Sequence, residues 1–329
     1  MMQVSGPSVD AIRELRATLG ADIYRTPMLR CGALEERLAD SARISAKLEF
    51  LQRTGTFKAR GALAVLKRLS AKQRAAGVTA VSAGNHAIAT AFAAAVTGTS
   101  AKVVMIRSAS PVRMELCRAF GAELVLADNV HAAFETAERI ERDEGRFFVH
   151  PFEGPDIAAG TGTIGLEISE QDSDFDAVLV PIGGGGLIGG MANALKQLRP
   201  DVEIIGVEPV GADTMHRSLR LGSPQAIDKV RTVADSLGAP FALPYSFELC
   251  RQHVDRIVLI EDDQLREAMG FLFSCMNIAV EPACAATTAA VLGPLRDEVA
   301  GRNIVLTMCG SNIDWATFAE LAVFKADSC

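Results

Sequence analysis

The regular alternation of strand-like and helix-like segments is the feature that most limits what this chain can fold into. Between residues 78 and 144, short apolar runs alternate with longer segments whose apolar residues recur at helical spacing. The expected strands are 78–81, 102–106 and 124–126, and the expected helices are 87–96, 111–120 and 131–144. Strand-then-helix units of this kind predict an α/β fold in which helices cover both faces of a parallel sheet.

The alternation continues on both sides of this region and predicts a second lobe. Further strands are expected at 44–48, 147–151, 177–181, 203–207, 256–260 and 304–308, and further helices at 8–19, 59–69, 163–170, 187–198, 262–273, 283–292 and 315–322. Residues 158–165 predict a glycine- and threonine-rich turn, and 243–254 an irregular to helical segment. Junctions near Lys47 and Pro151 then give a small domain of residues 48–151 and a large domain of residues 1–47 plus 152–329.

Composition argues against several classes of function. The chain has 329 residues and a net charge of -7 without a dense Lys/Arg stripe, which argues against nucleic acid as a partner. No apolar run reaches membrane-spanning length, and the first residues lack the pattern of a signal peptide. The seven cysteines, Cys329 among them, show no metal-ligand spacing, which fits reduced thiols in a soluble cytoplasmic protein.

Lys58 follows Phe57 in a short polar, glycine-containing stretch between two apolar segments. A lysine held in a pocket is desolvated, and desolvation favours its neutral, nucleophilic form. The alternative is an ordinary surface lysine at the start of a helix. Taken alone, Lys58 favours the surface interpretation, so its neighbours along the chain have to decide.

Four consecutive glycines, Gly183, Gly184, Gly185 and Gly186, connect an expected strand to the helix that begins at Leu187. Without side chains, several backbone N–H groups can point at one anion, and the helix N-terminus adds about half a positive charge. The run lacks the lysine of a P-loop and the spacing of a dinucleotide fingerprint. It predicts a phosphate site rather than a merely tight turn.

A second turn of small and polar residues, Ser82, Ala83, Gly84, Asn85 and His86, also lies between a strand and a helix. Free N–H groups at that helix N-terminus predict a carboxylate site. His86 is either a general base or a structural histidine.

Cys309 follows the last expected strand. It either packs in the core or faces a ring nitrogen, and alone it favours packing.

All these turns lie beyond the carboxyl ends of strands, where doubly wound sheets bind ligands. A nucleophilic lysine, a phosphate site, a carboxylate site and a partner for a ring nitrogen together describe pyridoxal phosphate and an amino acid.

The motifs carry a resemblance over nearly the whole chain. They are TGTFKARGA, SAGNHA, HPFEGP, GTIGLEI, PIGGGGLIGG, GVEP, TVADSL, EPACAA and CGSNID. The chain resembles the serine/threonine dehydratase and serine racemase group of pyridoxal-phosphate enzymes, which have the tryptophan-synthase-β type fold (fold type II). The resemblance implies two open parallel-type sheets covered by helices, with the cofactor between the two domains.

The resemblance also implies a role for each candidate residue. It makes Lys58 the Schiff-base lysine, places Phe57 beside the cofactor and Cys309 beside its pyridine nitrogen, and lets Asn85 hydrogen-bond its phenolic oxygen. The implied phosphate loop is Gly183, Gly184, Gly185, Gly186 and Leu187; Glu281 lines the other side of the cofactor; and Ser82, Ala83, Gly84, Asn85 and His86 form the substrate-carboxylate loop.

The implied reaction converts a β-hydroxy amino acid (L-threonine, L-serine or a 3-hydroxy analogue) into a 2-oxo acid and ammonium, in a homodimeric enzyme. The alternatives are a serine or other amino-acid racemase, and a non-catalytic ligand-binding relative. Racemases of this group place a serine opposite the lysine, where this chain has Ala83, and a thiol at the ring nitrogen favours loss of the β-substituent. Both features favour elimination.

Other departures concern a divalent cation, pocket size and regulation. The family's cation site is matched by Glu208 and Ala212, but its third position is Thr214, with Asp213 adjacent, so Mg²⁺ or another divalent cation is expected only weakly. Ser236 stands where many relatives have glycine, and residues 158–163 and 236–243 are expected to shape the substrate pocket. Because few residues follow the last expected helix, the C-terminal regulatory domain of biosynthetic threonine dehydratases, and feedback control through it, are not expected.

Overall fold

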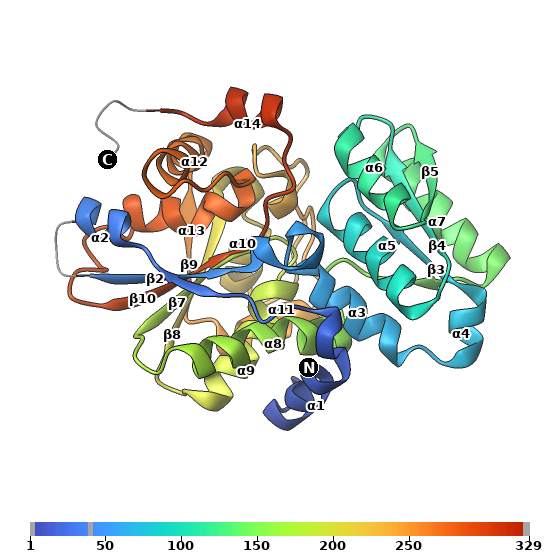
Figure 1. Ribbon diagram of the computed structural model, residues 1–329, viewed down its shortest axis with the longest axis horizontal. Coiled ribbons are helices and arrows are strands. Elements are labelled where there is room, and N and C mark those ends of the chain that lie inside the picture. Colours follow the sequence, from blue (N-terminus) through green and yellow to red (C-terminus); the bar gives the residue numbers. More distant parts are fainter. Residues whose placement is uncertain (1–3, 39–41, 325–329) are drawn as a thin grey trace.

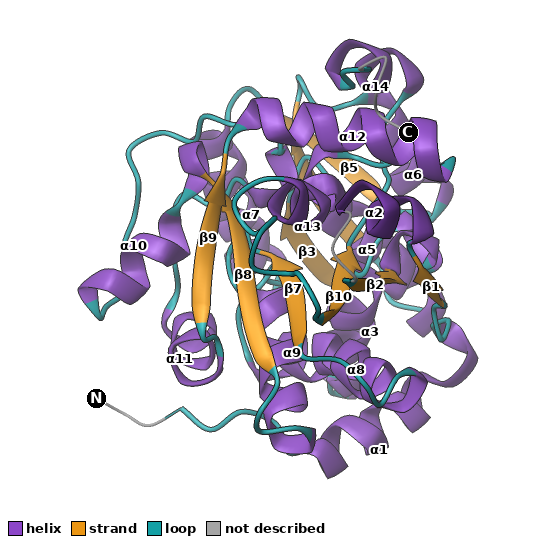
Figure 2. Cartoon of the chain, turned by 90° about the vertical axis from the view of Figure 1, so that its left-hand side faces the viewer, coloured by secondary structure: helices purple, strands orange, loops and turns teal. Residues whose placement is uncertain are grey.

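The computed structural model describes residues 4–38 and 42–324, and these residues form two sheets (Figures 1 and 2). The larger sheet has six strands in the order β1 (Met28–Arg30), β2 (Arg43–Leu48), β10 (Asn303–Met308), β7 (Ala177–Pro181), β8 (Glu203–Pro209) and β9 (Arg256–Ile260). All neighbours pair in parallel except β1, which is antiparallel to β2.

The smaller sheet has four parallel strands in the order β5 (Glu123–Ala127), β4 (Ala101–Ile106), β3 (Val78–Val81) and β6 (Phe147–Phe148). It lies on the right of Figure 1. Helices α5 (Asn85–Thr97) and α6 (Pro111–Ala119) contribute to the core on one face, while α7 (Val130–Glu144) packs on the other. The predicted α/β fold with two helix-covered, mostly parallel sheets is confirmed.

Helices also cover both faces of the larger sheet (Figures 1 and 2). On one face lie α12 (Asp262–Met276) and α13 (Pro282–Leu292), and on the other α8 (Pro155–Gln171), α9 (Gly186–Leu198) and α11 (Pro244–His253). Strand β7 is buried along its whole length, as expected for a central parallel strand. The remaining helices are α1 (Val9–Leu19), α2 (Gly32–Leu38), α3 (Lys58–Arg68), α4 (Ala71–Ala76), α10 (Thr214–Leu221) and α14 (Trp315–Leu321).

Helix α3 is fixed by a buried ion-pair network immediately after Lys58. Arg60 is fully buried, and its guanidinium donates to both oxygens of Glu49 at 2.8 Å and to Glu167 at 2.7 and 3.0 Å. Lys47 donates to the same Glu167 at 2.6 Å. These contacts join β2, α3 and α8, so the position of Lys58 is set by an electrostatic network as well as by apolar packing.

The predicted turn at 158–165 is wrong, because these residues lie inside α8. Their glycines serve helix packing: a Cβ on Gly160 would come within 2.7 Å of the carbonyl oxygen of Arg60 on α3. Both a tight turn and the close approach of two helix backbones require small residues, so the composition of this segment could not distinguish the two.

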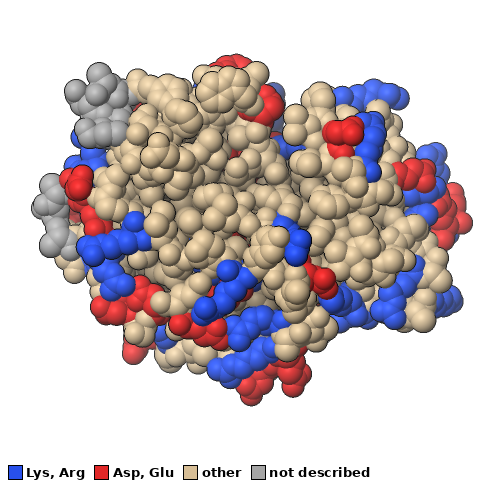
Figure 3. All heavy atoms as spheres, viewed as in Figure 1, with Lys and Arg blue, Asp and Glu red and all other residues tan. Residues whose placement is uncertain are grey.

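Other differences are small. The expected strand 147–151 ends at Phe148, and β1, α2, α4 and α10 were not predicted. Cys329 and the first three residues lie outside the described residues, whereas Cys31, Cys117, Cys250, Cys284 and Cys309 are buried and free. No helix among the described residues is long and apolar enough to cross a membrane. On the face shown in Figure 3, basic and acidic side chains are interspersed.

Candidate functional site

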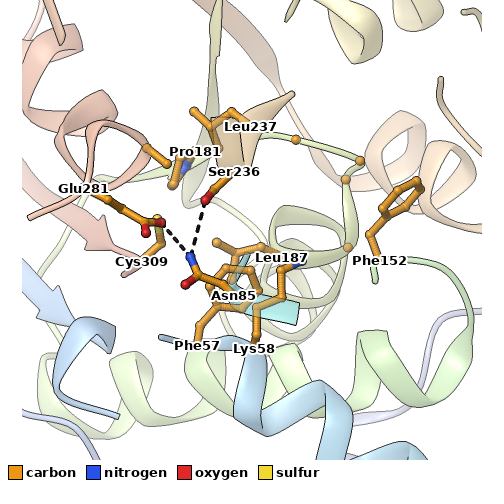
Figure 4. A pocket seen from close by; sticks show the side chains of 15 residues that line it. Phe57, Lys58, Asn85, Phe152, Pro181, Leu187, Ser236, Leu237, Glu281 and Cys309 are labelled. Carbon is orange, nitrogen blue, oxygen red and sulfur yellow. Dashed lines mark hydrogen bonds between the residues drawn. The ribbon is translucent and has the colours of Figure 1, made fainter. Parts of the chain in front are cut away.

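Lys58 is the first residue of α3, and its side chain points into a cavity between the two sheets (Figure 4). Its Nζ donates a hydrogen bond of 2.8 Å to the carbonyl oxygen of Pro151 and lies 5.1 Å from the centroid of the Phe57 ring. Burial lowers the pKa of Lys58 to about 8, although Cys309 and Glu281 act in the opposite direction. At pH 7 roughly a tenth of this amine is therefore neutral, compared with less than about a thousandth of an ordinary lysine.

The four glycines follow β7 and lead into α9, whose first residue is Gly186, and Gly184 and Gly186 lie directly against Phe152. A Cβ on Gly184 would come within 2.3 Å of the Phe152 ring, and one on Gly186 within 2.4 Å of the Phe152 carbonyl oxygen. Gly185 has a φ of +92°, which other residues rarely adopt. Because the first N–H groups of α9 have no partner within the helix, this bare turn can offer them to an anion.

Asn85 is the first residue of α5, and its side chain forms hydrogen bonds with residues of the larger lobe. Its Nδ2 donates to Oε1 of Glu281 at 2.7 Å and to Oγ of Ser236 at 3.4 Å, both drawn in Figure 4. Its Oδ1 accepts from Nδ2 of Asn312 at 2.7 Å, and Asn312 also donates to the carbonyl oxygen of Thr54 at 2.8 Å. The amide of Asn85 is thus held in one orientation from both sides.

Glu281 and Cys309 line the same cavity as Lys58. Burial raises the pKa of Glu281 to about 7, while Arg113 and Asn85 oppose that rise, and its Oε2 is buried with no hydrogen-bond partner among the described residues. A hydrogen bond with Cys284 together with burial raises the pKa of the Cys309 thiol well above its ordinary value. Cys309 is therefore a neutral thiol.

Two adjoining cavities occupy this region. The smaller, of about 40 Å³, is lined by the glycine turn, Phe57, Glu281 and Cys309. The larger, of about 290 Å³, is lined by Ser82, Ala83, Gly84 and His86 together with apolar side chains. Lys58, Asn85, Phe152, Gly184 and Ser236 line both. The structure thus brings every candidate cofactor- and substrate-site residue named above into one connected region.

His86 is buried, and one of its ring nitrogens lies 2.8 Å from the carbonyl oxygen of Val149. Burial, the nearby Lys58 and His150 lower its pKa to about 3, and that hydrogen bond only partly opposes them. A histidine that stays neutral and bonded to the backbone favours the structural alternative over the general base.

The weakly expected cation site has other contacts. Glu208 is buried, and its two oxygens accept from the backbone amides of Met215 and His216 at 2.9 and 2.7 Å. Thr214 donates to the carbonyl oxygen of Ala239, and Asp213 pairs with Arg217. Ala212 lies in the short helical turn 210–212, between Glu208 and Asp213. Within the described residues, no group of three or more His, Cys, Asp or Glu side chains is placed to hold a metal ion. These contacts favour a structural role for Glu208.

Sequence reasoning missed several residues at this site. Phe152, His150 and Asn312 lie within motifs noted above, HPFEGP and CGSNID, but nothing in their spacing showed that they meet Lys58 and Asn85. Of the two segments expected to shape the pocket, 236–243 contributes residues 236 and 238–241 to the larger cavity and Leu237 to the smaller one. The other segment, 158–163, lines neither cavity because it lies within α8.

The pKa of Lys58 makes a testable prediction. Because its amine must be neutral to react, the rate at which the cofactor-free protein captures pyridoxal phosphate should rise about tenfold per pH unit and level off near pH 8. Stopped-flow absorbance measures that rate, with N-acetyl-lysine as a reference. A capture rate that keeps rising to about pH 10, as for an ordinary lysine, would contradict the lowered pKa.

Comparison with known proteins supplies the family. The chain matches the pyridoxal-phosphate dependent enzymes over residues 20–310. It is 52% identical to a phenylserine dehydratase from Ralstonia pickettii, over 95% of this chain and 96% of that protein. It is 38% identical to an L-threonine ammonia-lyase from Thermotoga maritima, over 93% of this chain and 76% of that protein.

Among solved structures, maize serine racemase superposes with a TM-score of 0.91 at 30% identity, covering 96% of this chain and 97% of that one. The two sheets and these similarities define a pyridoxal-phosphate enzyme of fold type II. The chain belongs to the family of pyridoxal-phosphate dependent enzymes.

Proposed function

We propose that this protein is a pyridoxal-phosphate-dependent dehydratase that converts a β-hydroxy amino acid into a 2-oxo acid and ammonium. The observation that carries the proposal is Lys58, a lysine of lowered pKa that lies between a bare glycine turn and the turn at Asn85. The dehydratase and ammonia-lyase activities named for the relatives support it. Those names offer phenylserine and threonine as substrates, and serine is the third candidate.

The residues present fit the cofactor. The glycine turn leaves no room for a Cβ where a phosphate needs direct access to N–H groups, and Lys58 supplies the amine. A neutral thiol at Cys309 suits an unprotonated ring nitrogen, and the oriented amide of Asn85 suits a ring oxygen. When bound, the cofactor supplies an electron sink conjugated to the substrate's Cα.

We propose the following roles for the protein's own groups. Lys58 Nζ would hold the cofactor until the substrate's amine takes its place, and the freed lysine amine would then take the proton from the substrate's Cα, a task suited to an amine whose pKa is about 8. Gly183, Gly184, Gly185, Gly186 and Leu187 bind the phosphate through backbone N–H groups. Phe57 packs beside the ring, and Glu281 orients Asn85 through their 2.7 Å hydrogen bond.

The turn of Ser82, Ala83, Gly84, Asn85 and His86 is proposed to bind the substrate carboxylate. It lies at the N-terminus of α5, where backbone N–H groups attract an anion. That anchor places Cα near Lys58, which lines the same cavity. Loss of the β-hydroxyl as water, which consumes the equivalent of the proton that Lys58 took, then completes the elimination. The released enamine tautomerises to an imine, and water hydrolyses that imine to the 2-oxo acid and ammonium.

The finer features of the enzyme are proposals that follow from the resemblance. Residues 48–151 would form the small substrate-loop domain and 1–47 plus 152–329 the large cofactor domain, a division that agrees with the distribution of strands between the two sheets. A homodimer in the cytoplasm is the corresponding assembly and location.

Elimination is favoured over racemisation because the face opposite Lys58 has Ala83 instead of a hydroxyl. The variant Ala83→Ser should raise the ratio of racemisation to elimination by at least about tenfold, since a second proton donor is restored. Chiral chromatography of serine and an assay of pyruvate, run on the same reaction, measure that ratio. Ser82→Ala, in the same turn, is the matched control and should not raise the ratio. An unchanged ratio in Ala83→Ser would show that Ala83 is not the reason for elimination.

A further inference from the structure

The larger cavity extends well beyond the space that a reacting Cα and its carboxylate need. From Lys58 and the turn at 82–86 it reaches the carboxyl ends of β3 and β4 and the first turns of α7. Its volume is about 290 Å³. The part of this space beside Lys58, Asn85 and Gly184 is shared with the cofactor site, so the room for a substrate side chain is the remainder, which lies against β4, α7 and Phe241.

The far wall of this cavity is apolar. Strand β4 contributes Val104 and Ile106, and α7 contributes Val130, Ala133 and Phe134. Two further aromatic rings, Phe152 and Phe241, close it from the larger lobe, with centroids 6.3 Å apart. Such walls offer water few hydrogen bonds, whereas an aromatic ring of a ligand can pack edge-to-face against Phe134, Phe152 and Phe241.

Among the described residues that line the cavity, Lys58 is the one cation that could meet an acidic substrate side chain, and the proposed reaction uses it. His150 lines the cavity, but its Nδ1 accepts the backbone amides of Phe152 and Glu153 at 3.2 and 3.0 Å. Burial together with Lys58 lowers the pKa of His150 to about 4, so the ring is neutral. Asp235, the acidic residue of the lining, is paired with Arg113 at 2.6 Å. The substrate side chain that fits is uncharged and apolar.

We propose that this cavity is the subsite for an aryl group on the substrate's β-carbon, and that Ala133 and Phe134 of α7 set the preference for it. The inference rests on the proposed function, because it identifies the cavity with the substrate side chain. The preferred substrate is then a 3-aryl-3-hydroxy amino acid. Ala133 leaves room for the ring because it is small and lines the wall, and Phe134 supplies an aromatic contact.

The test measures binding and turnover separately on the cofactor-loaded enzyme. L-phenylalanine carries the ring without a β-hydroxyl, so it binds without elimination, and L-alanine lacks the ring. From the change in cofactor absorbance, L-phenylalanine should bind about 30-fold more tightly than L-alanine, the gain expected from burying a phenyl group. In Ala133→Leu and in Phe134→Ala, this ratio should fall by about tenfold.

Turnover of threo-3-phenylserine relative to L-threonine should fall with the binding ratio in both variants, while L-threonine turnover stays within about threefold of the parent. Ala132→Leu is the matched control, because Ala132 is the neighbouring alanine on α7 and does not line the cavity. It should change neither ratio.

The outcomes separate the two proposals. Equal binding of L-phenylalanine and L-alanine, or ratios that Ala133→Leu and Phe134→Ala leave unchanged, would overturn the aryl subsite even if threonine and serine are dehydrated. Absence of 2-oxo acid from every hydroxy amino acid would overturn the dehydratase instead, and a ring-dependent binding ratio would still support the subsite.

Discussion

Replacing Lys58 by alanine is expected to abolish both the yellow, borohydride-reducible chromophore with pyridoxal phosphate and the dehydration of hydroxy amino acids. The amine is the proposed attachment point and the proposed base at Cα, and the cavity lining offers no second lysine among the described residues. A lost general base alone lowers the rate by about 10²–10⁴-fold. Absorbance after borohydride reduction and a 2-oxo acid assay measure the two losses.

Lys67→Ala is the matched control, because Lys67 is on the same helix and forms a partly exposed ion pair with Asp22 at 2.7 Å. It should keep the chromophore and the activity. If Lys58→Ala still formed the reducible chromophore, the assignment of Lys58 would be wrong. If it lost the chromophore but kept the full rate, the cofactor would not be needed for the reaction.

Arg60→Ala is expected to destabilise the fold by about 3–5 kcal/mol, because it leaves buried carboxylates without their main cation. Arg60 is bonded to both Glu49 and Glu167, and all three side chains are buried. Lys47 then remains as the partner of Glu167 alone. Urea unfolding of the protein without and with cofactor measures the change, and the midpoint should fall in both.

Arg68→Ala provides the comparison on the same helix. Arg68 pairs with Asp156, but both side chains are substantially exposed, so the loss should stay below about 1 kcal/mol. Equal effects of the two substitutions would contradict the claim that the buried network holds α3. A stable Arg60→Ala protein with normal cofactor binding would show that apolar packing alone positions Lys58.

Much of the fold followed from local pattern, since strands and helices of a parallel α/β protein alternate in both hydrophobicity and length. The segments around Lys58, Asn85 and the glycine turn were assigned to the correct elements for this reason. The failure at 158–165 has a physical cause. Glycine permits a turn, but it also permits the close approach of α8 to α3, and only the tertiary structure separates these uses.

The site could be predicted residue by residue only where a short motif carries its own chemistry, as the glycine turn does. The hydrogen-bond partners of Asn85 could not be predicted, because Glu281 and Asn312 lie about two hundred residues away in the sequence. The aromatic wall of the larger cavity could not be predicted from the sequence either. Phe134 lies on α7 and Phe241 in the loop before α11, and no spacing along the chain relates them.

The most direct test of the proposed function follows all products of one reaction. Purified protein loaded with pyridoxal phosphate is incubated with threo-3-phenylserine, L-threonine or L-serine, and 2-oxo acid, ammonium and the D-enantiomer of the amino acid are measured together. We expect equal amounts of 2-oxo acid and ammonium, little D-enantiomer, and no products without the cofactor. Accumulation of D-enantiomer without 2-oxo acid or ammonium would contradict the dehydratase and favour a racemase.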